Sequence, residues 1–207
     1  MAYTDIDDPS AYFQPKTYTG NGDSADDTNA ITNDGNSDLK PDFLWIKRRD
    51  YDNGHQLADS TRGVTKFLGS ETTAAEYTQA GRLASFNTDG FTVQSSSGAF
   101  NAENEPFVAW QWKANGGTTA SNSDGSITST VQANQDAGFS IITWAGGGTG
   151  TLGHGLGETP DMWIIKNRDY AVSWAIGFSD SNILGGRSKY LSLNTTGAIS
   201  TYNNFWG

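Results

Sequence analysis

Cysteine is absent from all 207 residues, and proline, basic residues and long aliphatic runs are scarce. Without thiols the fold can hold neither a disulfide nor a thiolate metal site. Thirteen Lys and Arg stand against 23 Asp and Glu, and the net charge of −10 disfavours a nucleic acid backbone or an anionic lipid surface as partner. No window approaches the roughly 18 apolar residues that cross a bilayer, so no membrane insertion is expected.

What the sequence has in quantity is aromatic and turn-forming residues. Seven Trp, eight Tyr and ten Phe supply large surfaces for a core, and 25 Gly accompany many Asn, Asp, Ser and Thr. Runs of period two between turn residues predict an all-β fold, an antiparallel β-sandwich or jelly roll. Only Glu71–Gly81 has some helical character. The predicted strands are Phe43–Arg48, Phe67–Ser70, Leu83–Asn87, Phe91–Gln94, Phe107–Lys113, Ile127–Gln132, Phe139–Trp144, Met162–Asn167, Ser173–Phe178 and Lys189–Leu193.

An internal repeat organises the chain. Pro41–Tyr51 returns as Pro160–Tyr170, with seven of eleven positions identical. Two further blocks recur in the same order and at nearly constant offset, which indicates a duplicated unit. These blocks pair Thr17–Gly22 with Thr143–Gly148, and Gly63–Ala75 with Gly186–Ala198.

The repeat predicts three parts. Residues 1–114 form the first β-sandwich repeat, 115–137 a linker with a connecting strand, and 138–207 a second, incomplete repeat. Within the linker, Asn115–Asp124 is expected to be a loop. The second copy has no counterpart of residues 85–114, so we expect it to leave a sheet edge open. Either neighbouring chains or the first copy would supply the missing strands, or the chain is a piece of a longer protein.

Candidate catalytic and metal-binding residues are few. His55 and His154 lack the spacing of a zinc site, and His154 is either a ligand-contacting loop residue or part of a turn. Glu103 and Glu105 share a strand face, as glycosidase carboxylates can, but their polar surroundings favour solvated loop acids. Asp34–Asp38 has alternating oxygen ligands without the rest of a calcium loop. The sequence predicts no catalytic residue, no metal site and no cofactor.

Two groups of residues are candidates for binding or structural roles. Trp110 and Trp112 either form a platform that stacks on sugars or belong to the core, and the core is favoured because one strand face must be buried. Arg49 and Arg168 are expected to pair with local carboxylates such as Asp59 or Asp50. We assign a structural role to the repeated motif residues Asp42, Trp45, Lys47, Arg49, Asp50, Asp161, Lys166, Arg168 and Asp169.

Several longer strings carry a family resemblance. They are Asp7–Phe13, Tyr18–Gly22, Asn33–Lys47, His55–Gly63, Leu83–Phe86, Asp89–Phe91, Val108–Ala114, His154–Gly157 and Pro160–Asp169. Through these strings the chain resembles a repeat domain found in structural and tail-fibre-like proteins of marine phages, namely the phages of cyanobacteria and of SAR11-type bacteria. The resemblance covers nearly the whole chain. It implies a concanavalin-like β-sandwich of the lectin and glucanase type.

The resemblance also implies a location on the virion surface and supplies no catalytic residues. The expected function is a non-catalytic structural protein of a phage appendage: a tail fibre, capsid fibre or capsid decoration, with a part in host attachment. The alternatives are a carbohydrate-binding module for host glycans, with Trp110, Trp112 and His154 as contacts, and, ranked last, a polysaccharide depolymerase. By analogy with fibres, we expect a homo-oligomer, foremost a trimer, that contacts other virion proteins.

Overall fold

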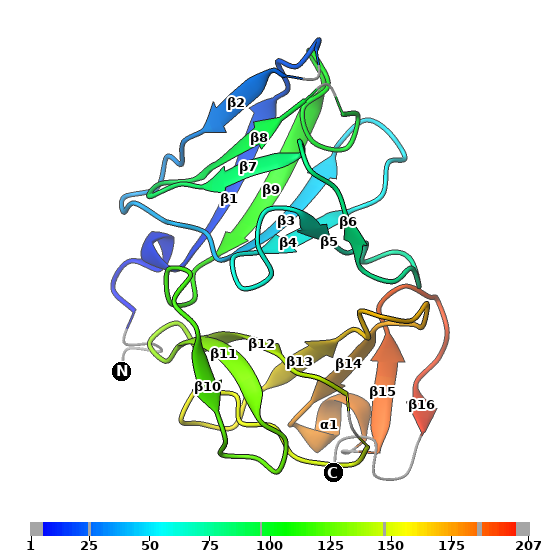
Figure 1. Cartoon of the computed structure of the whole chain (residues 1–207). Helices are drawn as coiled ribbons and strands as arrows, with labels where there is room; N and C mark the ends of the chain where they lie inside the picture. Colours follow the sequence, from blue (N-terminus) through cyan, green and yellow to red (C-terminus); the bar gives the residue numbers. More distant parts are fainter. Residues whose placement is uncertain (1–5, 25, 96, 147, 186–187, 202–207) are drawn as a thin grey trace.

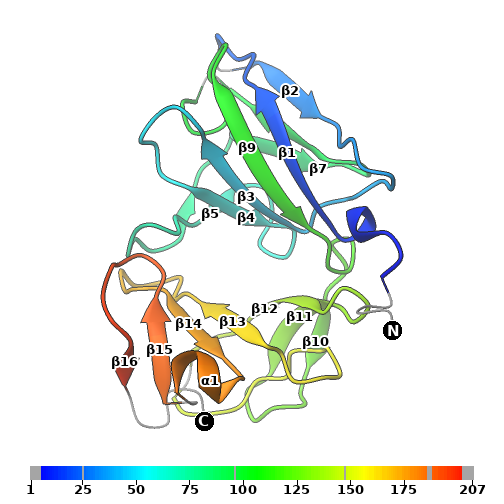
Figure 2. The same ribbon diagram turned by 180° about the vertical axis from the view of Figure 1, so that it is seen from behind.

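The computed structural model describes residues 6–24, 26–95, 97–146, 148–185 and 188–201, and nearly all of its regular structure is antiparallel strand (Figure 1). The prediction of an all-β fold is confirmed. Strands β1 to β9 form a first lobe and strands β10 to β16 a second lobe, and the view from behind shows the same division (Figure 2). Residues 186 and 187, which begin the third repeated block, lie outside the described residues.

Two antiparallel sheets pack face to face in the first lobe, which is the arrangement of a β-sandwich. The larger sheet has the order β1-β9-β3-β4, so β9 lies between β1 and β3. The smaller sheet has the order β2-β8-β7, and β5 and β6 form a separate ribbon. The strands are β1 Phe13–Thr19, β2 Thr28–Ile31, β3 Phe43–Arg48, β4 Gln56–Asp59, β5 Lys66–Phe67, β6 Tyr77–Thr78, β7 Leu83–Phe86, β8 Phe91–Gln94 and β9 Pro106–Trp112.

The core of the first lobe fills the space between these sheets. Strand alternation selects its residues: along β9, Phe107, Ala109 and Gln111 are buried while their neighbours are half-buried. The buried Gln111 donates from Nε2 to Oδ1 of Asn33 at 2.6 Å, which offsets part of the cost of its desolvation. Each fully buried Leu or Phe stabilises the fold by roughly 1.5–3 kcal/mol. The cluster comprises Ile31, Leu44, Ile46, Ala58, Phe67, Leu83, Phe91, Val93, Phe100, Phe107 and Ala109.

Two smaller sheets build the second lobe, with the orders β10-β11-β12 and β13-β14-β15-β16. The short helix α1 connects β14 to β15 and begins at the N-cap Asp180, whose side chain accepts a hydrogen bond from the Asn182 N–H at 2.8 Å. The elements are β10 Ala120–Asn122, β11 Ser129–Asn134, β12 Phe139–Thr143, β13 Met162–Ile165, β14 Ala175–Phe178, α1 Ser181–Leu184, β15 Lys189–Ser192 and β16 Ser200–Thr201. The described helical segments, Pro9–Ala11 and α1, are three and four residues long and cannot cross a bilayer.

Two segments differ from the expectations of the sequence. Glu71–Gly81 forms no helix: it consists of turns and β6, because its groups bind elsewhere. The Glu76 carboxylate lies 2.9 Å from Nη1 of Arg62, and the Glu76 N–H donates to the carbonyl oxygen of Arg168 at 2.8 Å. Asn115–Asp124 is not wholly loop either, since β10 lies within it and pairs with β11.

The two lobes share a small apolar cluster. Leu57 and Leu68 of the first lobe and Trp174 of the second are its buried members. Trp174 is 5% exposed, and its Nε1 donates a hydrogen bond to the carbonyl oxygen of Gly69 at 2.8 Å. Phe43, Trp45 and Leu193 pack around this cluster. The lobes are therefore joined by burial and by a directed polar contact.

Candidate functional site

Aromatic side chains cover the face of the β1-β9-β3-β4 sheet that lies opposite the core. Trp110 and Trp112 alternate with the buried residues of β9 and therefore project from the other face, where both are half-buried. The favoured expectation that they belong to the core is wrong, because Phe107, Ala109 and Gln111 already supply the buried face of β9. We name the aromatic face after the five residues that form it: Phe13, Phe43, Trp45, Trp110 and Trp112.

The strand registers arrange this aromatic face in rows. Phe13, Trp112 and Phe43 are opposite one another across β1, β9 and β3, and Trp110 lies opposite Trp45 in the next row. The ring centroids of Phe13 and Trp112 are 4.8 Å apart, those of Phe43 and Trp112 5.4 Å, and those of Trp45 and Trp110 6.3 Å. Such contacts hold the rings in fixed orientations, as a stacking surface requires.

The second lobe covers one end of the aromatic face. Phe139, the first residue of β12, stacks on Trp112 with a centroid distance of 6.2 Å and lies 6.3 Å from Phe43. Phe13, at the outer side of the same row, is 36% exposed. The aromatic face is thus partly an interface between lobes and partly open to solvent.

His55 contacts the aromatic face at Trp45. Nε1 of Trp45 donates to Nδ1 of His55 at 2.7 Å, which requires an unprotonated Nδ1 and hence the neutral imidazole with its proton on Nε2. Burial lowers the pKa of His55 below its ordinary value, although the nearby Glu71 carboxylate acts in the opposite direction. His55 therefore orients the Trp45 indole. Sequence reasoning missed this pairing, because the two residues are ten positions apart with a loop between them.

His154, the third predicted sugar contact, lies in a different place. Its Nδ1 accepts a hydrogen bond from the Leu156 N–H at 3.2 Å within a turn before β13. No described hydrogen bond or ring contact joins it to Trp110 or Trp112. The structure brings the two tryptophans onto one face and leaves His154 in a turn that it helps to form.

Asp42 and Gln132 bind four successive main-chain amides where the first lobe ends. Asp42 Oδ2 accepts from the N–H groups of residues 114 and 116 at 2.7 and 2.8 Å, and Gln132 Oε1 from those of 115 and 117 at 3.1 and 2.7 Å. Both side chains are fully buried. Gly116 and Gly117 have φ of 64° and 87°, which lets these amides turn inward. We call Asp42 and Gln132 the amide clamp.

The amide clamp also connects the lobes. Ser60 Oγ donates to Asp42 Oδ1 at 2.6 Å, and Gln132 Nε2 donates to Ser60 Oγ and to Thr61 Oγ1, each at 2.9 Å. Because Gln132 belongs to β11, this network fixes the second lobe to a loop of the first. Sequence reasoning singled out Asp42 through its motif and missed Gln132. The neighbouring Gly116-Gly117 pair was the available signal of a main-chain binding site.

The charged residues of the repeated motif pair differently from expectation. Asp50 accepts from Arg48 at 2.8 Å, not from Arg49, and Asp59 from Arg62 at 2.5 Å. Arg49 forms no ion pair within the described part of the chain, because its side chain lies on the exposed end of β3 where Arg48 takes the local carboxylates. Arg168 does pair with a carboxylate, that of Glu76 at 3.7 Å, although neither Asp50 nor Asp59 is its partner. The exposed Asp169 donates its main-chain N–H to Oδ1 of Asn167 at 2.9 Å.

Two loops of the repeated motif share one local geometry. Lys47 Nζ donates to the carbonyl oxygens of Arg48 and Tyr51 at 2.6 and 2.7 Å. Lys166 Nζ donates to those of Asn167 and Tyr170 at 2.7 and 3.2 Å. Burial lowers the pKa of Lys166. Each lysine thus closes its own loop, and both loops leave a tyrosine more than half exposed: Tyr51 61% and Tyr170 68%.

Among the residues that the structure describes, the acidic side chains do not converge on a reactive site. Glu105 is ion-paired with Arg48 at 2.5 Å, and Glu103 is exposed. No three His, Cys, Asp or Glu side chains of the described residues are grouped to hold a metal ion, and Asp34 instead pairs with Lys16 at 2.9 Å.

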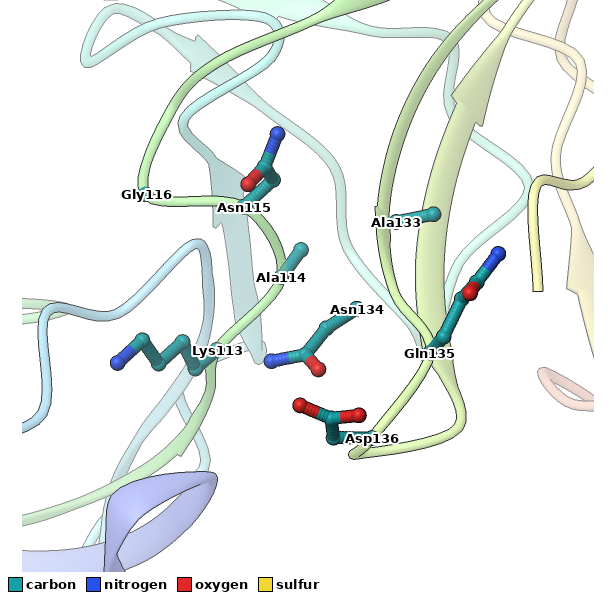
Figure 3. Close-up of a pocket in the computed structure, with 8 residues that line it drawn as sticks. All are labelled: Lys113, Ala114, Asn115, Gly116, Ala133, Asn134, Gln135 and Asp136. Carbon is teal, nitrogen blue, oxygen red and sulfur yellow. The ribbon is translucent and has the colours of Figure 1, made fainter.

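A groove of about 580 Å³ runs between residues 113–116 and the turn at 133–136. In Figure 3, Lys113 points away from Asn134 and Asp136, so the single positive group of the lining does not face the acidic one. Asn134 is itself used within the turn, where its Oδ1 accepts from the Ala137 N–H at 3.0 Å. The groove lies between the segment that follows β9 and the turn that joins β11 to β12, and it presents no charge pattern that would select a ligand.

No curated protein and no solved structure matches the chain. One family model, described as a domain of unknown function (DUF7483), matches residues 8–207. This match includes both lobes, the aromatic face and the amide clamp. The chain therefore belongs to the family described as a domain of unknown function (DUF7483).

Proposed function

We propose that this chain is a non-catalytic structural module of a bacteriophage surface appendage, such as a tail fibre, capsid fibre or capsid decoration. The observation that carries the proposal is the set of repeated strings around Pro41–Tyr51 and Pro160–Tyr170, which resemble marine-phage repeat domains. The fold favours the same role: the two lobes are locked by the amide clamp and by Trp174 into one unit. A rigid unit of this kind suits a protein that serves by its shape and its surfaces.

The proposal includes duplication of one folding unit. Three features recur with nearly constant spacing and support it. β13 begins 119 residues after β3, and β14 begins 119 residues after β4, so the two hairpins have the same internal spacing. Lys47 and Lys166, also 119 apart, close their loops with the same bonds. Lys66 donates to Thr78 as Lys189 donates to Thr201, with 189 − 66 = 123 and 201 − 78 = 123.

The finer fold assignment, a concanavalin-like jelly roll, is part of the same proposal. Its support is the face-to-face packing of β1-β9-β3-β4 on β2-β8-β7, with β9 returning to the middle of the larger sheet.

The direct test is to find the protein in particles. Gradient-purified phage from a genome that encodes this chain is analysed by mass spectrometry, and antibodies against the purified chain are located by electron microscopy. The proposal expects the chain in the particle at stoichiometric amounts, with label on its exterior. Presence only in the lysate, or digestion of a polysaccharide by the pure chain, would contradict it. Light scattering of the purified chain tests the expected oligomer, foremost a trimer.

Carbohydrate binding is the second candidate, and the aromatic face favours it. Trp110, Trp112 and the 36% exposed Phe13 lie on one face of the sheet, with Phe13 and Trp112 held at an interplanar angle of 50°, and exposed aromatic rings held in place in this way can stack on sugar rings. The test is affinity electrophoresis on a panel of bacterial surface polysaccharides. The Trp110→Ala variant is expected to migrate without being retarded by the polysaccharide that retards the parent chain. Tyr51→Ala, which removes an exposed ring from a loop, is the matched control and is expected to be retarded like the parent chain.

A further inference from the structure

One strand of the second lobe has an open edge. Ser179 N–H donates to the Asp161 carbonyl oxygen at 3.0 Å, and the register continues from this pair along β13 and β14. Hydrogen-bonded and non-bonded pairs alternate in an antiparallel ladder. The peptide groups of Met162 and Ile164 therefore point away from β14. Among the described residues, β13 forms a ladder only with β14, so no strand is hydrogen-bonded to this edge.

The edge of β13 is apolar, and the strand contains neither the charged side chains nor the proline that often protect sheet edges. Its sequence, Met-Trp-Ile-Ile, contains no charge and no proline, and Met162 and Ile164 are 48% and 39% exposed. The outer edge of β1 is different. There the Lys113 N–H donates to the Tyr12 carbonyl oxygen, which sets the alternation so that Pro15 faces outward. A proline without an N–H blocks strand addition at that edge.

In the first lobe, the strand edge that corresponds to the open edge of β13 is paired with another strand. Phe43 and Trp45 are the counterparts of Met162 and Ile164, since 43 + 119 = 162 and 45 + 119 = 164. Their peptide groups face β9, as the bond from the Arg49 N–H to the carbonyl oxygen of residue 106 at 2.9 Å establishes. β9 therefore fills the edge of β3 that corresponds to the open edge of β13.

We propose that the open edge of β13 binds an extended polypeptide segment of the β9 type from a partner chain. The segment lies antiparallel to β13, with large apolar side chains opposite Met162 and Ile164 as Trp112 and Trp110 lie opposite Phe43 and Trp45 in the first lobe. Main-chain hydrogen bonds supply the affinity, and the alternating side chains supply the selectivity. The inference rests on the proposed duplication and not on the phage assignment.

The experiment uses the full chain and a fluorescein-labelled peptide with the sequence of residues 105–114. Fluorescence anisotropy measures binding, with a scrambled peptide of the same composition as control. Amide hydrogen exchange, measured by NMR, is expected to slow at Met162 and Ile164 when the peptide binds, because their N–H groups gain hydrogen-bond acceptors. The amide of Ile165 already bonds β14 and is expected to stay unchanged.

Two variants locate the binding. Ile164→Pro removes the outward N–H, while the hydrogen bonds to β14 stay. This variant is expected to bind the peptide about tenfold more weakly. Thr17→Pro makes the same change at the outer edge of β1 and is expected to leave binding unchanged. Should Ile164→Pro fail to fold, Ile164→Lys tests the same edge, because it adds a charge on an exposed side chain.

Absence of saturable binding would overturn the inference, as would binding that Ile164→Pro and Ile164→Lys leave intact. A dimer through β13 that the peptide does not displace would overturn it too, because a second copy would then be the occupant. None of these outcomes depends on whether the chain is found in phage particles. The failure of this inference is thus separable from that of the proposed function.

Discussion

Removal of the Asp42 carboxylate is expected to destabilise the whole protein. Asp42 is fully buried and accepts three hydrogen bonds, from the main-chain N–H groups of residues 114 and 116 and from Ser60 Oγ, at 2.6–2.8 Å. In Asp42→Ala both amides lose their acceptor. A buried donor left unsatisfied costs about 1–3 kcal/mol, and Ser60 keeps its bond to Gln132. We therefore expect a loss of about 3–5 kcal/mol in the free energy of unfolding.

Asp161 is the matched control, since it occupies the same place in the second copy of the motif. It is exposed, and its main-chain carbonyl, not its carboxylate, forms the hydrogen bond to Ser179. Asp161→Ala is expected to change stability by less than about 0.5 kcal/mol. At roughly 2–4 °C per kcal/mol for a chain of this size, Asp42→Ala lowers the melting temperature by about 6–20 °C.

Urea unfolding followed by tryptophan fluorescence, and calorimetry of the same variants, measure these changes. Equal effects of Asp42→Ala and Asp161→Ala would refute the reasoning, because the two aspartates differ in burial and in bonding but not in sequence context. So would a loss below about 1 kcal/mol for Asp42→Ala, since the amides of residues 114 and 116 would then have found other acceptors.

Further predictions concern the lobe junction and two charged groups. Trp174→Ala is expected to cost about 3–5 kcal/mol in calorimetric unfolding and to expose the linker to limited proteolysis, whereas Trp174→Phe loses chiefly the bond to Gly69. Arg62→Met leaves the buried Asp59 carboxylate without its cation, whereas Glu76 keeps Arg168 at 3.7 Å, and we expect a loss of about 3–5 kcal/mol. The exposed Arg49→Met is expected to cost less than about 0.5 kcal/mol. Because burial lowers the pKa of His55 below 6.5, its contribution to stability is complete above 6.5 and is lost as pH falls through the lowered pKa. Thermal melts of His55→Gln are expected to depend less on pH between 7 and 5 than those of the parent chain.

Sequence reading located strands whose own side chains specify them. Phe43–Arg48 and Phe91–Gln94 were predicted with the bounds that β3 and β8 have, because apolar residues alternate there between turn residues. It missed β1, whose sequence Phe-Gln-Pro-Lys-Thr-Tyr-Thr contains a proline and little apolar alternation. The ladder with β9 creates that strand. Such a partner, distant in sequence, leaves no local signal.

The candidate site was harder to predict than the strands. Trp110 and Trp112 were identified, but the pattern of β9 favours the wrong face for the core: Val108, Trp110 and Trp112 are all apolar, whereas the face that enters the core carries Gln111. Gln111 enters the core because Asn33 accepts its hydrogen bond, and that partner is 78 residues away. Pairings of this kind depend on the assembled sheets.

The amide clamp has a consequence for how this family can vary. Asp42 and Gln132 recognise the N–H groups of residues 114 to 117, which every amino acid except proline carries. The lobe junction therefore depends on two buried side chains and on the left-handed backbone of Gly116 and Gly117, and not on the exposed side chain of Asn115. Asn115, Thr118 and Thr119 are exposed and can be exchanged without loosening the joint. A surface next to the lobe junction is thus free to diversify while the architecture beneath it stays constant.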